Sequence, residues 1–304
     1  MKLSATKDTE LIAVAAELLR QDPHGLRTAR VLRGTFDQLY DGQRTGRYRW
    51  DQLYKTEKTH CGTLVEINLQ REFKFTDGLI LDYRIAGFEV DCKYSQTVGG
   101  WMIPPEARGH LCVVLSATDG AAPLWNMGLV RAIPAYLNPG VNRDGKAALA
   151  AAGKNALFWL FRNAALPSNV LLQLDAQSVA AIFAHGSGQK RINELFRLGV
   201  GRIVGRAAVA TVAQQSDYMK RVRANGGART TLQQEGILVL GQFSSHKAIA
   251  TSLGLPSPGP GDSLSVRVTP AAGKGSGVAM ISGGYWRVAN TGDAVVRAPD
   301  LPEI

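Results

Sequence analysis

The sequence has little cysteine and no long apolar runs. Its three cysteines are an odd number without the spacing of a disulfide scaffold, which favours a reducing compartment and no disulfides. No run of about 18 apolar residues is present, so no membrane span is expected. The first residues also lack the apolar region of a signal peptide. We therefore expect a cytoplasmic protein without a membrane partner.

Acidic residues are also scarce. The chain has 35 Lys and Arg against 25 Asp and Glu, which gives a net charge of +10. An excess of this kind indicates polyanionic partners. The basic residues concentrate in two segments. Residues 190–229 hold nine Lys and Arg against two acidic residues, and residues 43–58 hold five against two, with Tyr and Trp between them.

A length of 304 residues is enough for two domains. In the first half, helical and strand-like segments predict an α/β domain with a mixed sheet over residues 1–162. The expected helices are 9–20, 28–40, 62–73 and an alanine-rich segment at 146–161, and the expected strands are 81–85, 88–94, 110–116 and 128–134. A Leu-Pro-Ser sequence at 166–168 marks the domain boundary.

The second half, residues 168–304, reads as an α+β domain. Helices are expected at 175–184, 189–198, 202–213 and 216–225, and short strands at 229–231, 236–241, 264–268 and 285–289. Gly226-Gly227 is expected to end the fourth of these helices. A helix-turn-helix at about 202–225 followed by a β-wing is a pattern that docks on DNA.

The richest segment for chemistry is Asp82–Lys93. Apolar and polar residues alternate strictly on both sides of Ala86-Gly87, which predicts a hairpin with one apolar face. A two-residue turn there pairs Arg84 with Glu89 and sets Asp82 opposite Asp91. Ala-Gly is not a preferred pair for this turn, but a slip of one residue would expose the apolar set.

Directly opposed like charges destabilise a sheet, so two aspartates in this register need a reason. A hard divalent cation such as Mg²⁺ supplies one, and Lys93 lies one pleat away. Metal-held carboxylates with a fixed positive charge suit phosphodiester hydrolysis. Glu66, on the preceding helix, is a candidate third acid. The alternative is a surface hairpin whose charges are merely solvated.

These residues also carry a family resemblance. Asp82…Asp91-Cys-Lys93 resembles the Asp…(Asp/Glu)-x-Lys core of restriction-type endonucleases. Residues 35–66, 90–93 and 210–229 resemble the NaeI family of type II restriction endonucleases. The resemblance implies a restriction-endonuclease-like core, a C-terminal winged-helix domain with a CAP-like helix-turn-helix, and a homodimer. It further implies Mg²⁺-dependent cleavage of both strands of a short palindrome, suggested as GCCGGC, with activation by a second DNA copy and a cognate methyltransferase as functional partner.

Carried over residue by residue, the resemblance assigns catalysis to Glu66, Asp82, Asp91 and Lys93, with the three acids as metal ligands. Leu81 stands where a proline often precedes the first aspartate. Residues 39–42 resemble a ligase nucleotidylation motif in which Leu39 replaces the lysine, so strand rejoining by that route is not expected. The residues expected to contact DNA are Arg44, Arg47, Arg49, Lys55 and Lys58, beside the hairpin, and Lys220, Arg221, Arg223 and Arg229.

Two other functions remain open at this stage. A non-enzymatic DNA-binding regulator would use the helix-turn-helix beside an inactive nuclease fold. A nicking repair endonuclease would share the hairpin but cut one strand.

Overall fold

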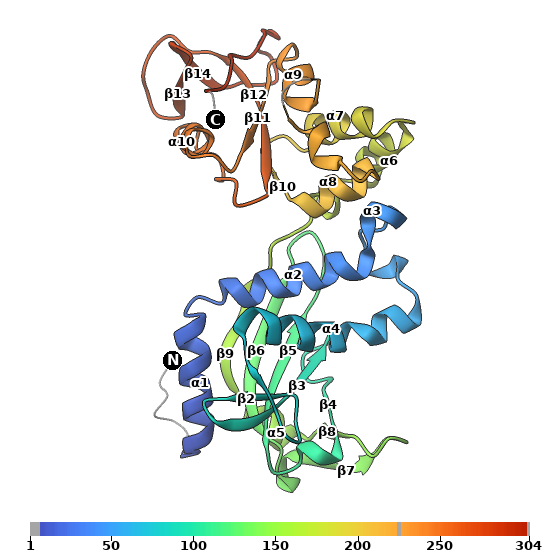
Figure 1. Cartoon of the computed structure of the whole chain (residues 1–304). Coiled ribbons are helices and arrows are strands. Elements are labelled where there is room, and N and C mark those ends of the chain that lie inside the picture. The colour runs from blue at the N-terminus through green and yellow to red at the C-terminus, as the bar shows by residue number, and fades with distance from the viewer. Residues whose placement is uncertain (1–6, 224–225, 303–304) are drawn as a thin grey trace. The chain divides into compact units, whose positions relative to one another are not determined.

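The computed structural model describes residues 7–223 and 226–302. The chain forms two compact units (Figure 1). The first contains the residues up to Leu39 together with Leu53–Ser168, and the second contains Tyr40–Gln52 together with the residues from Asn169 onward. Two differences from the expected ranges stand out. A strand, Phe158–Ala165, runs across residue 162, and the segment 40–52 groups with the second unit.

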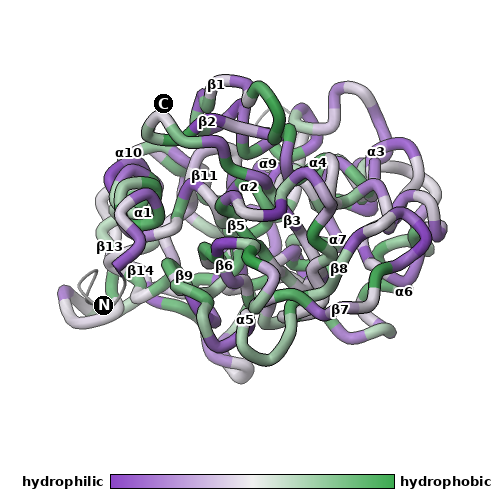
Figure 2. The backbone as a smooth tube through the Cα atoms, turned by 90° about the horizontal axis from the view of Figure 1, so that it is seen from below, coloured by the Kyte–Doolittle hydropathy of each residue, from purple (hydrophilic) through white to green (hydrophobic). Residues whose placement is uncertain are grey.

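The first unit is built on a six-stranded mixed sheet, as the sequence predicts. Its order is β1-β2-β3-β5-β6-β9, and within it only β3 and β5 run parallel. The strands are β1 (Thr76–Asp77), β2 (Tyr83–Ile85), β3 (Phe88–Ser95), β5 (Leu111–Ala117), β6 (Leu124–Arg131) and β9 (Phe158–Ala165). All seven residues of β5 are buried, and all but Ser116 are apolar, as expected of a strand that is covered on both faces. Figure 2 shows the hydropathy of each residue along the chain.

Helices cover this sheet: α1 (Thr9–Gln21), α2 (Leu26–Tyr40) and α4 (Lys55–Phe73). Helix α4 lies over the strands (Figure 1) and begins earlier than residue 62, because Glu57 caps its first turn by accepting from the Tyr54 amide at 2.8 Å. Its buried residues recur every fourth position, at Cys61, Val65, Leu69 and Phe73. Asn68, beside that stripe, donates to the Thr35 hydroxyl of α2 at 3.0 Å. The two helices are therefore tied together above the sheet.

The alanine-rich segment 146–161 is not one helix, and that prediction was wrong. It contains β8 (Ala147–Leu149), a five-residue helix α5 (Ala151–Asn155) and the start of β9. Strand β8 joins a small sheet with β4 (Met102–Ile103) and β7 (Leu137–Val141). Aromatic residues explain the outcome, since Phe158, Trp159 and Phe161 favour a strand and pair with β6. The helix propensity of the alanines is therefore not enough to continue the helix beyond Asn155.

The second unit has a helical core and a sheet. The helices are α3 (Gly42–Thr45), α6 (Ala176–Ala184), α7 (Gly188–Leu198), α8 (Arg206–Ala213), α9 (Ala228–Gln233) and α10 (Ser244–Ser252). Short 3₁₀ turns lie at Trp50–Gln52, Val170–Leu172 and Tyr218–Arg221. The sheet follows the order β10 (Ile203–Val204), β12 (Ser263–Pro270), β14 (Gly284–Val288) and β13 (Val278–Ile281), and β11 (Ile237–Gly241) also pairs with β12.

The region expected to hold the second helix of a helix-turn-helix differs from the prediction. Tyr218–Arg221 is a single 3₁₀ turn, and residues 224–225, inside the expected helix, lie outside the described residues. Helix α9 occupies the place expected for a strand at 229–231. Gly227 begins α9 instead of ending a helix, and Ala228 and Leu232, one turn apart, are buried in the core. Paired β-branched threonines at 230–231 had favoured a strand.

Within the described part of the chain, no helix is both long enough and apolar enough to cross a membrane.

One buried histidine joins α10 to the end of β11. His246 is 1% exposed, and its Nδ1 accepts a hydrogen bond from the Gly241 amide at 3.0 Å. That nitrogen must be unprotonated to accept. Burial, aided by the nearby Arg229 charge, lowers the pKa of His246 to about 4.

We expect acid to destabilise the second unit through this residue. The folded pKa lies below the unfolded value of about 6.5, so between pH 6.5 and pH 4 the unfolded chain binds more protons and stability falls as pH falls. The full loss is about 3 kcal/mol. Urea unfolding of the wild type and of His246→Asn, whose amide oxygen can accept without titrating, at pH 7, 6 and 5 measures it. Equal pH slopes in the two proteins would contradict the assignment.

Candidate active site

The hairpin has the predicted register. Tyr83 pairs with Val90, Arg84 with Glu89 and Ile85 with Phe88. The turn closes because Ala86 and Gly87 both take positive φ values, 52° and 86°, as in type I′ turns. A left-handed alanine costs about 1–2 kcal/mol, which the packed strands on either side must offset.

Asp82, Asp91 and Lys93 meet at one point. The Lys93 Nζ lies 2.8 Å from Asp91 Oδ1, 2.8 Å from the Cys92 carbonyl oxygen and 3.5 Å from Asp82 Oδ2. The Cys92 amide donates to the same Asp82 oxygen at 2.7 Å. Although Asp82 lies one residue before β2, its side chain is thus tied to β3 beside Asp91.

Burial and the oppositely charged neighbours have opposing effects on the pKa values of Asp91 and of Lys93. Asp91 is 3% exposed, and no group in the described part of the chain donates a hydrogen bond to its buried Oδ2. Burial raises the pKa of Asp91 to about 6, and Asp82 adds to the rise while Lys93 opposes it. Burial lowers the pKa of Lys93, but the Asp91 and Asp82 carboxylates outweigh it and the net shift is upward. Lys93 is therefore a fixed positive charge.

Glu66 approaches this group from α4. The Tyr83 hydroxyl donates to the Glu66 carbonyl oxygen at 2.7 Å, which ties the helix to β2. Burial raises the pKa of the Glu66 carboxyl to about 7, and the Asp82 charge raises it further against the effect of Lys93. Among residues 7–223 and 226–302, however, no three His, Cys, Asp or Glu side chains gather closely enough to hold a metal ion. The charges of Asp82 and Asp91 thus raise the pKa of Glu66, but the three carboxyl groups do not form one set of metal ligands among the described residues.

The donors present suit a hard divalent cation. Mg²⁺ is commonly held by only one or two carboxylates and keeps several waters. Asp82 and Asp91 are two such carboxylates, and the Cys92 carbonyl oxygen faces the same ammonium group. Among the residues that the structure describes, Asp91 Oδ2 has no donor, and a cation bound there would satisfy it.

Glu89 has a role that the sequence did not indicate. Its carboxylate accepts from three successive amides, those of Leu79 at 2.9 Å, Ile80 at 3.1 Å and Leu81 at 3.0 Å. The expected cross-strand partner Arg84 lies farther away, at 3.8 Å. Three consecutive amides on one carboxylate form a compact anion nest and hold the loop that leads into Asp82. In the sequence, only Gly78 points to this tight loop: the backbone there leaves no room for a side chain, because a Cβ would lie 2.1 Å from the Leu81 carbonyl oxygen.

The basic patch expected over residues 43–58 is divided. Lys55 and Lys58 belong to α4 in the first unit, whereas Arg44, Arg47 and Arg49 belong to the second. DNA contact by these five residues stays a prediction, as does their position beside the hairpin.

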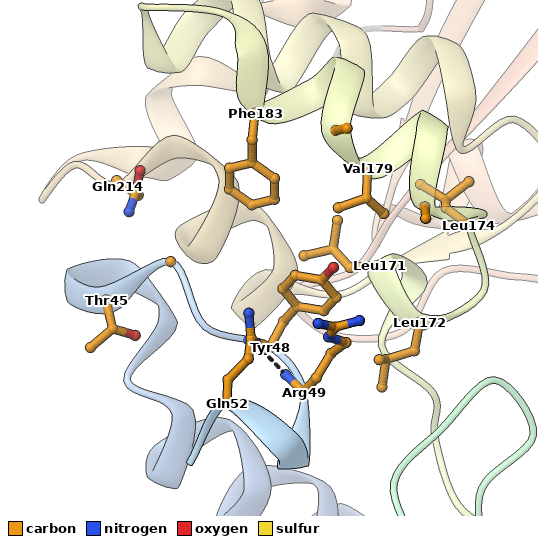
Figure 3. A pocket seen from close by; sticks show the side chains of 13 residues that line it. Thr45, Tyr48, Arg49, Gln52, Leu171, Leu172, Leu174, Val179, Phe183 and Gln214 are labelled. Atoms are coloured by element: carbon orange, nitrogen blue, oxygen red, sulfur yellow. Dashed lines mark hydrogen bonds between the residues drawn. The ribbon is translucent and has the colours of Figure 1, made fainter. Parts of the chain in front are cut away.

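Arg49, with Tyr48 and Gln52 of the same segment, lines a pocket of about 670 Å³ within the second unit (Figure 3). The Tyr48 ring lies nearly parallel to Phe183, with 6.3 Å between centroids and 11° between planes. The Gln52 side chain accepts from the Tyr48 and Arg49 amides, both at 2.9 Å. The segment thus has its own packing partner, α6.

The C-terminal basic residues have unequal surroundings. Arg221 donates to the Gln215 side chain at 2.7 Å, and Arg229 is half-buried, with its Nε 3.0 Å from the Val239 carbonyl oxygen. Lys220 is exposed on the 3₁₀ turn, and Arg223 is exposed just after it. DNA contact by these four residues stays a prediction.

Replacing Glu89 with glutamine tests the loop clamp. A glutamine side chain has no charge and only one accepting oxygen, so it holds the three loop amides less tightly. We expect the amides of Leu79, Ile80 and Leu81 to exchange with deuterium roughly tenfold faster than in the wild type, because they lose their charged acceptor. Glu106→Gln, an exposed glutamate on the 3₁₀ turn Pro105–Ala107, is the control. Unchanged exchange in the Glu89 variant would show that the clamp is dispensable.

Comparison with known proteins places this geometry in context. The family described as Restriction endonuclease NaeI matches residues 12–297. The chain is 50% identical to the type II restriction enzyme NaeI of Lentzea aerocolonigenes over 306 aligned residues, covering 98% of this chain and 96% of that protein. The match spans the hairpin, Glu66 and both units. The chain therefore belongs to the NaeI family of restriction endonucleases.

Proposed function

We propose that this protein is a type II restriction endonuclease that requires Mg²⁺ and hydrolyses phosphodiester bonds in both strands of a short DNA palindrome. Family membership makes it a site-specific endonuclease. The observation that carries the chemistry is the contact of Lys93 with Asp91 and Asp82 on one hairpin.

Each side chain has a proposed task. Asp82 and Asp91 would hold Mg²⁺, which supplies a Lewis acid for the phosphate when bound. Lys93 keeps its proton and offers a positive charge to the charged oxygens of the transition state. The raised pKa of Glu66, about 7, suits a carboxylate that exchanges a proton with water, so we assign it to orienting the attacking water.

The division of labour between the units is part of the proposal. The first unit cuts, and the second binds DNA through a helix-turn-helix-like arrangement that includes α8 and α9 and carries Lys220, Arg221, Arg223 and Arg229. Family membership also supports a homodimer, a GC-rich site such as GCCGGC, activation by a second DNA copy and a cognate methyltransferase that protects the cell's DNA. We place the enzyme in the cytoplasm, where that DNA lies.

Lys93→Ala tests the chemistry. Removing one preorganised charge from the transition state costs roughly 10²–10³ in rate. We expect wild-type protein with Mg²⁺ to convert a supercoiled plasmid into discrete linear fragments and Lys93→Ala to do so at least roughly 10²-fold more slowly. Gel analysis of a plasmid of known sequence, with mapping of the fragment ends, measures both the rate and the site.

The matched control is Lys154→Ala, an exposed lysine of α5, which should cut at the wild-type rate. Lys93→Ala should still bind DNA in a gel-shift assay. If wild-type protein binds DNA and leaves the plasmid intact with Mg²⁺, a DNA-binding regulator is the better description. A nicked product without linear fragments would indicate a nicking enzyme.

Activation by a second DNA copy has a separate test. A plasmid with one cleavage site should be cut slowly, and adding a short duplex that carries the same site should speed its cleavage. A coupling free energy of 1–3 kcal/mol corresponds to roughly 5–150-fold. A duplex of scrambled sequence is the control. Equal rates with the two duplexes would mean that no second specific copy is required.

A further inference from the structure

We propose that the second unit contains a phosphate-binding pocket centred on Arg229. The pocket is about 800 Å³ and is lined by three arginines, Arg206, Arg223 and Arg229, and by one carboxylate, that of Asp262. Its source of phosphate, a DNA strand, rests on the function proposed above. The pocket itself follows from charges and contacts inside the second unit.

Arg229 supplies the first reason. Its side chain is half-buried, and its one hydrogen bond to residues 7–223 and 226–302 runs from Nε to the Val239 carbonyl oxygen. Burial lowers its pKa, and no acidic group counters the shift. A guanidinium that is removed from water without a counter-charge is costly, so a bound anion would offset that cost.

The other charged residues of the lining leave Arg229 unpaired. Arg206 is held by the Tyr218 hydroxyl at 2.7 Å and lies over that ring, with 5.6 Å between its guanidinium carbon and the ring centroid. Asp262 accepts a hydrogen bond from the Gly259 amide at 3.1 Å, and no cation among the described residues affects its pKa. The lining therefore carries three positive charges against one carboxylate.

The shape of the pocket fits a phosphate with an organic group attached. Guanidinium forks bind phosphate oxygens in pairs. Gly241 leaves space beside the fork, since a Cβ there would lie 3.4 Å from Arg229 Nη2 and 3.5 Å from the Phe243 ring. Phe243 and Val222 add an apolar wall. The ligand class is a nucleotide, with its phosphate at the arginines and its sugar or base against Phe243.

Arg229→Gln tests the pocket, with Arg202→Gln as its matched control. Arg202 is an exposed arginine of the same unit, and its guanidinium contacts the Leu198 carbonyl oxygen outside the pocket. Binding of a fluorescent 20-base-pair duplex is measured without Mg²⁺ at several salt concentrations. We expect Arg229→Gln to weaken binding roughly 10–100-fold, as for loss of a charged hydrogen-bond pair. The slope of log affinity against log salt should fall by about 1.

Arg206→Gln keeps the proposal testable if the Arg229 variant does not fold. Arg206 is exposed, and its replacement removes only its contacts with Tyr218, so the variant should still fold, which a melting curve checks. It should still weaken duplex binding and lower the salt slope by about 1. Binding by both variants within threefold of Arg202→Gln would overturn the proposal.

A second measurement separates the source of the phosphate. Deoxyadenosine monophosphate is added at a matched ionic strength, and the melting temperatures of the wild type and of Arg229→Gln are compared. Stabilisation of the wild type alone supports a pocket that accepts free nucleotides. Duplex binding that depends on Arg229 without this stabilisation supports a DNA phosphate as the ligand. Equal stabilisation of both proteins, with Arg229-independent duplex binding, rejects the pocket.

The pocket and the nuclease assignment can fail separately. If the protein never cuts DNA but Arg229→Gln abolishes phosphate binding, the pocket is supported and the proposed nuclease function is contradicted. If the protein cuts DNA and replacing Arg229 or Arg206 has no effect on binding, the nuclease function is supported and the pocket is contradicted.

Discussion

Asp82 and Asp91 bring two negative charges together, and Lys93 Nζ lies 2.8 Å from one and 3.5 Å from the other. Without that ammonium, a carboxylate as buried as that of Asp91 would favour its protonated form. The ammonium is itself fixed by the Cys92 carbonyl oxygen at 2.8 Å. The geometry of the candidate site thus depends on this one contact between oppositely charged groups two residues apart on β3.

The rest of the first unit serves to keep this contact in place. The parallel pairing of β3 with the fully buried β5 fixes Asp91 beside Cys112 in the sheet. Tyr83 ties α4 to the hairpin through the Glu66 carbonyl, and Glu89 orders the loop before Asp82. A rigid set of supports lets a site present charges to a transition state without reorganisation. The supports lie on strands, a helix and a clamped loop, and each one involves a different residue.

The sequence predicted the hairpin well because the relevant physics is local. Alternating polarity and a two-residue turn determine the register, so the Arg84–Glu89 pair and the meeting of Asp82 with Asp91 follow from spacing alone. The Glu89 contacts were missed because their partners are three loop amides, which leave no side-chain pattern apart from the glycine at position 78. Helix α9 was missed because burial of Ala228 and Leu232 in a distant core overrode the strand preference of two threonines. The grouping of residues 40–52 with the second unit depends on contacts across more than a hundred residues of chain.

That grouping has a consequence for how the chain can be divided. The backbone passes from one unit to the other at Leu39–Tyr40, returns at Gln52–Leu53 and passes over again at Ser168–Asn169. Gln43 donates to the Gln215 carbonyl oxygen at 3.1 Å, and a Cβ on Gly42 would lie 2.0 Å from the Thr211 hydroxyl. A fragment that starts at Asn169 would leave these partners and the Phe183 ring without the segment that covers them. The second unit therefore includes a segment, residues 40–52, from the N-terminal half of the chain. Neither unit can be separated as an independent domain by cutting the chain at a single position.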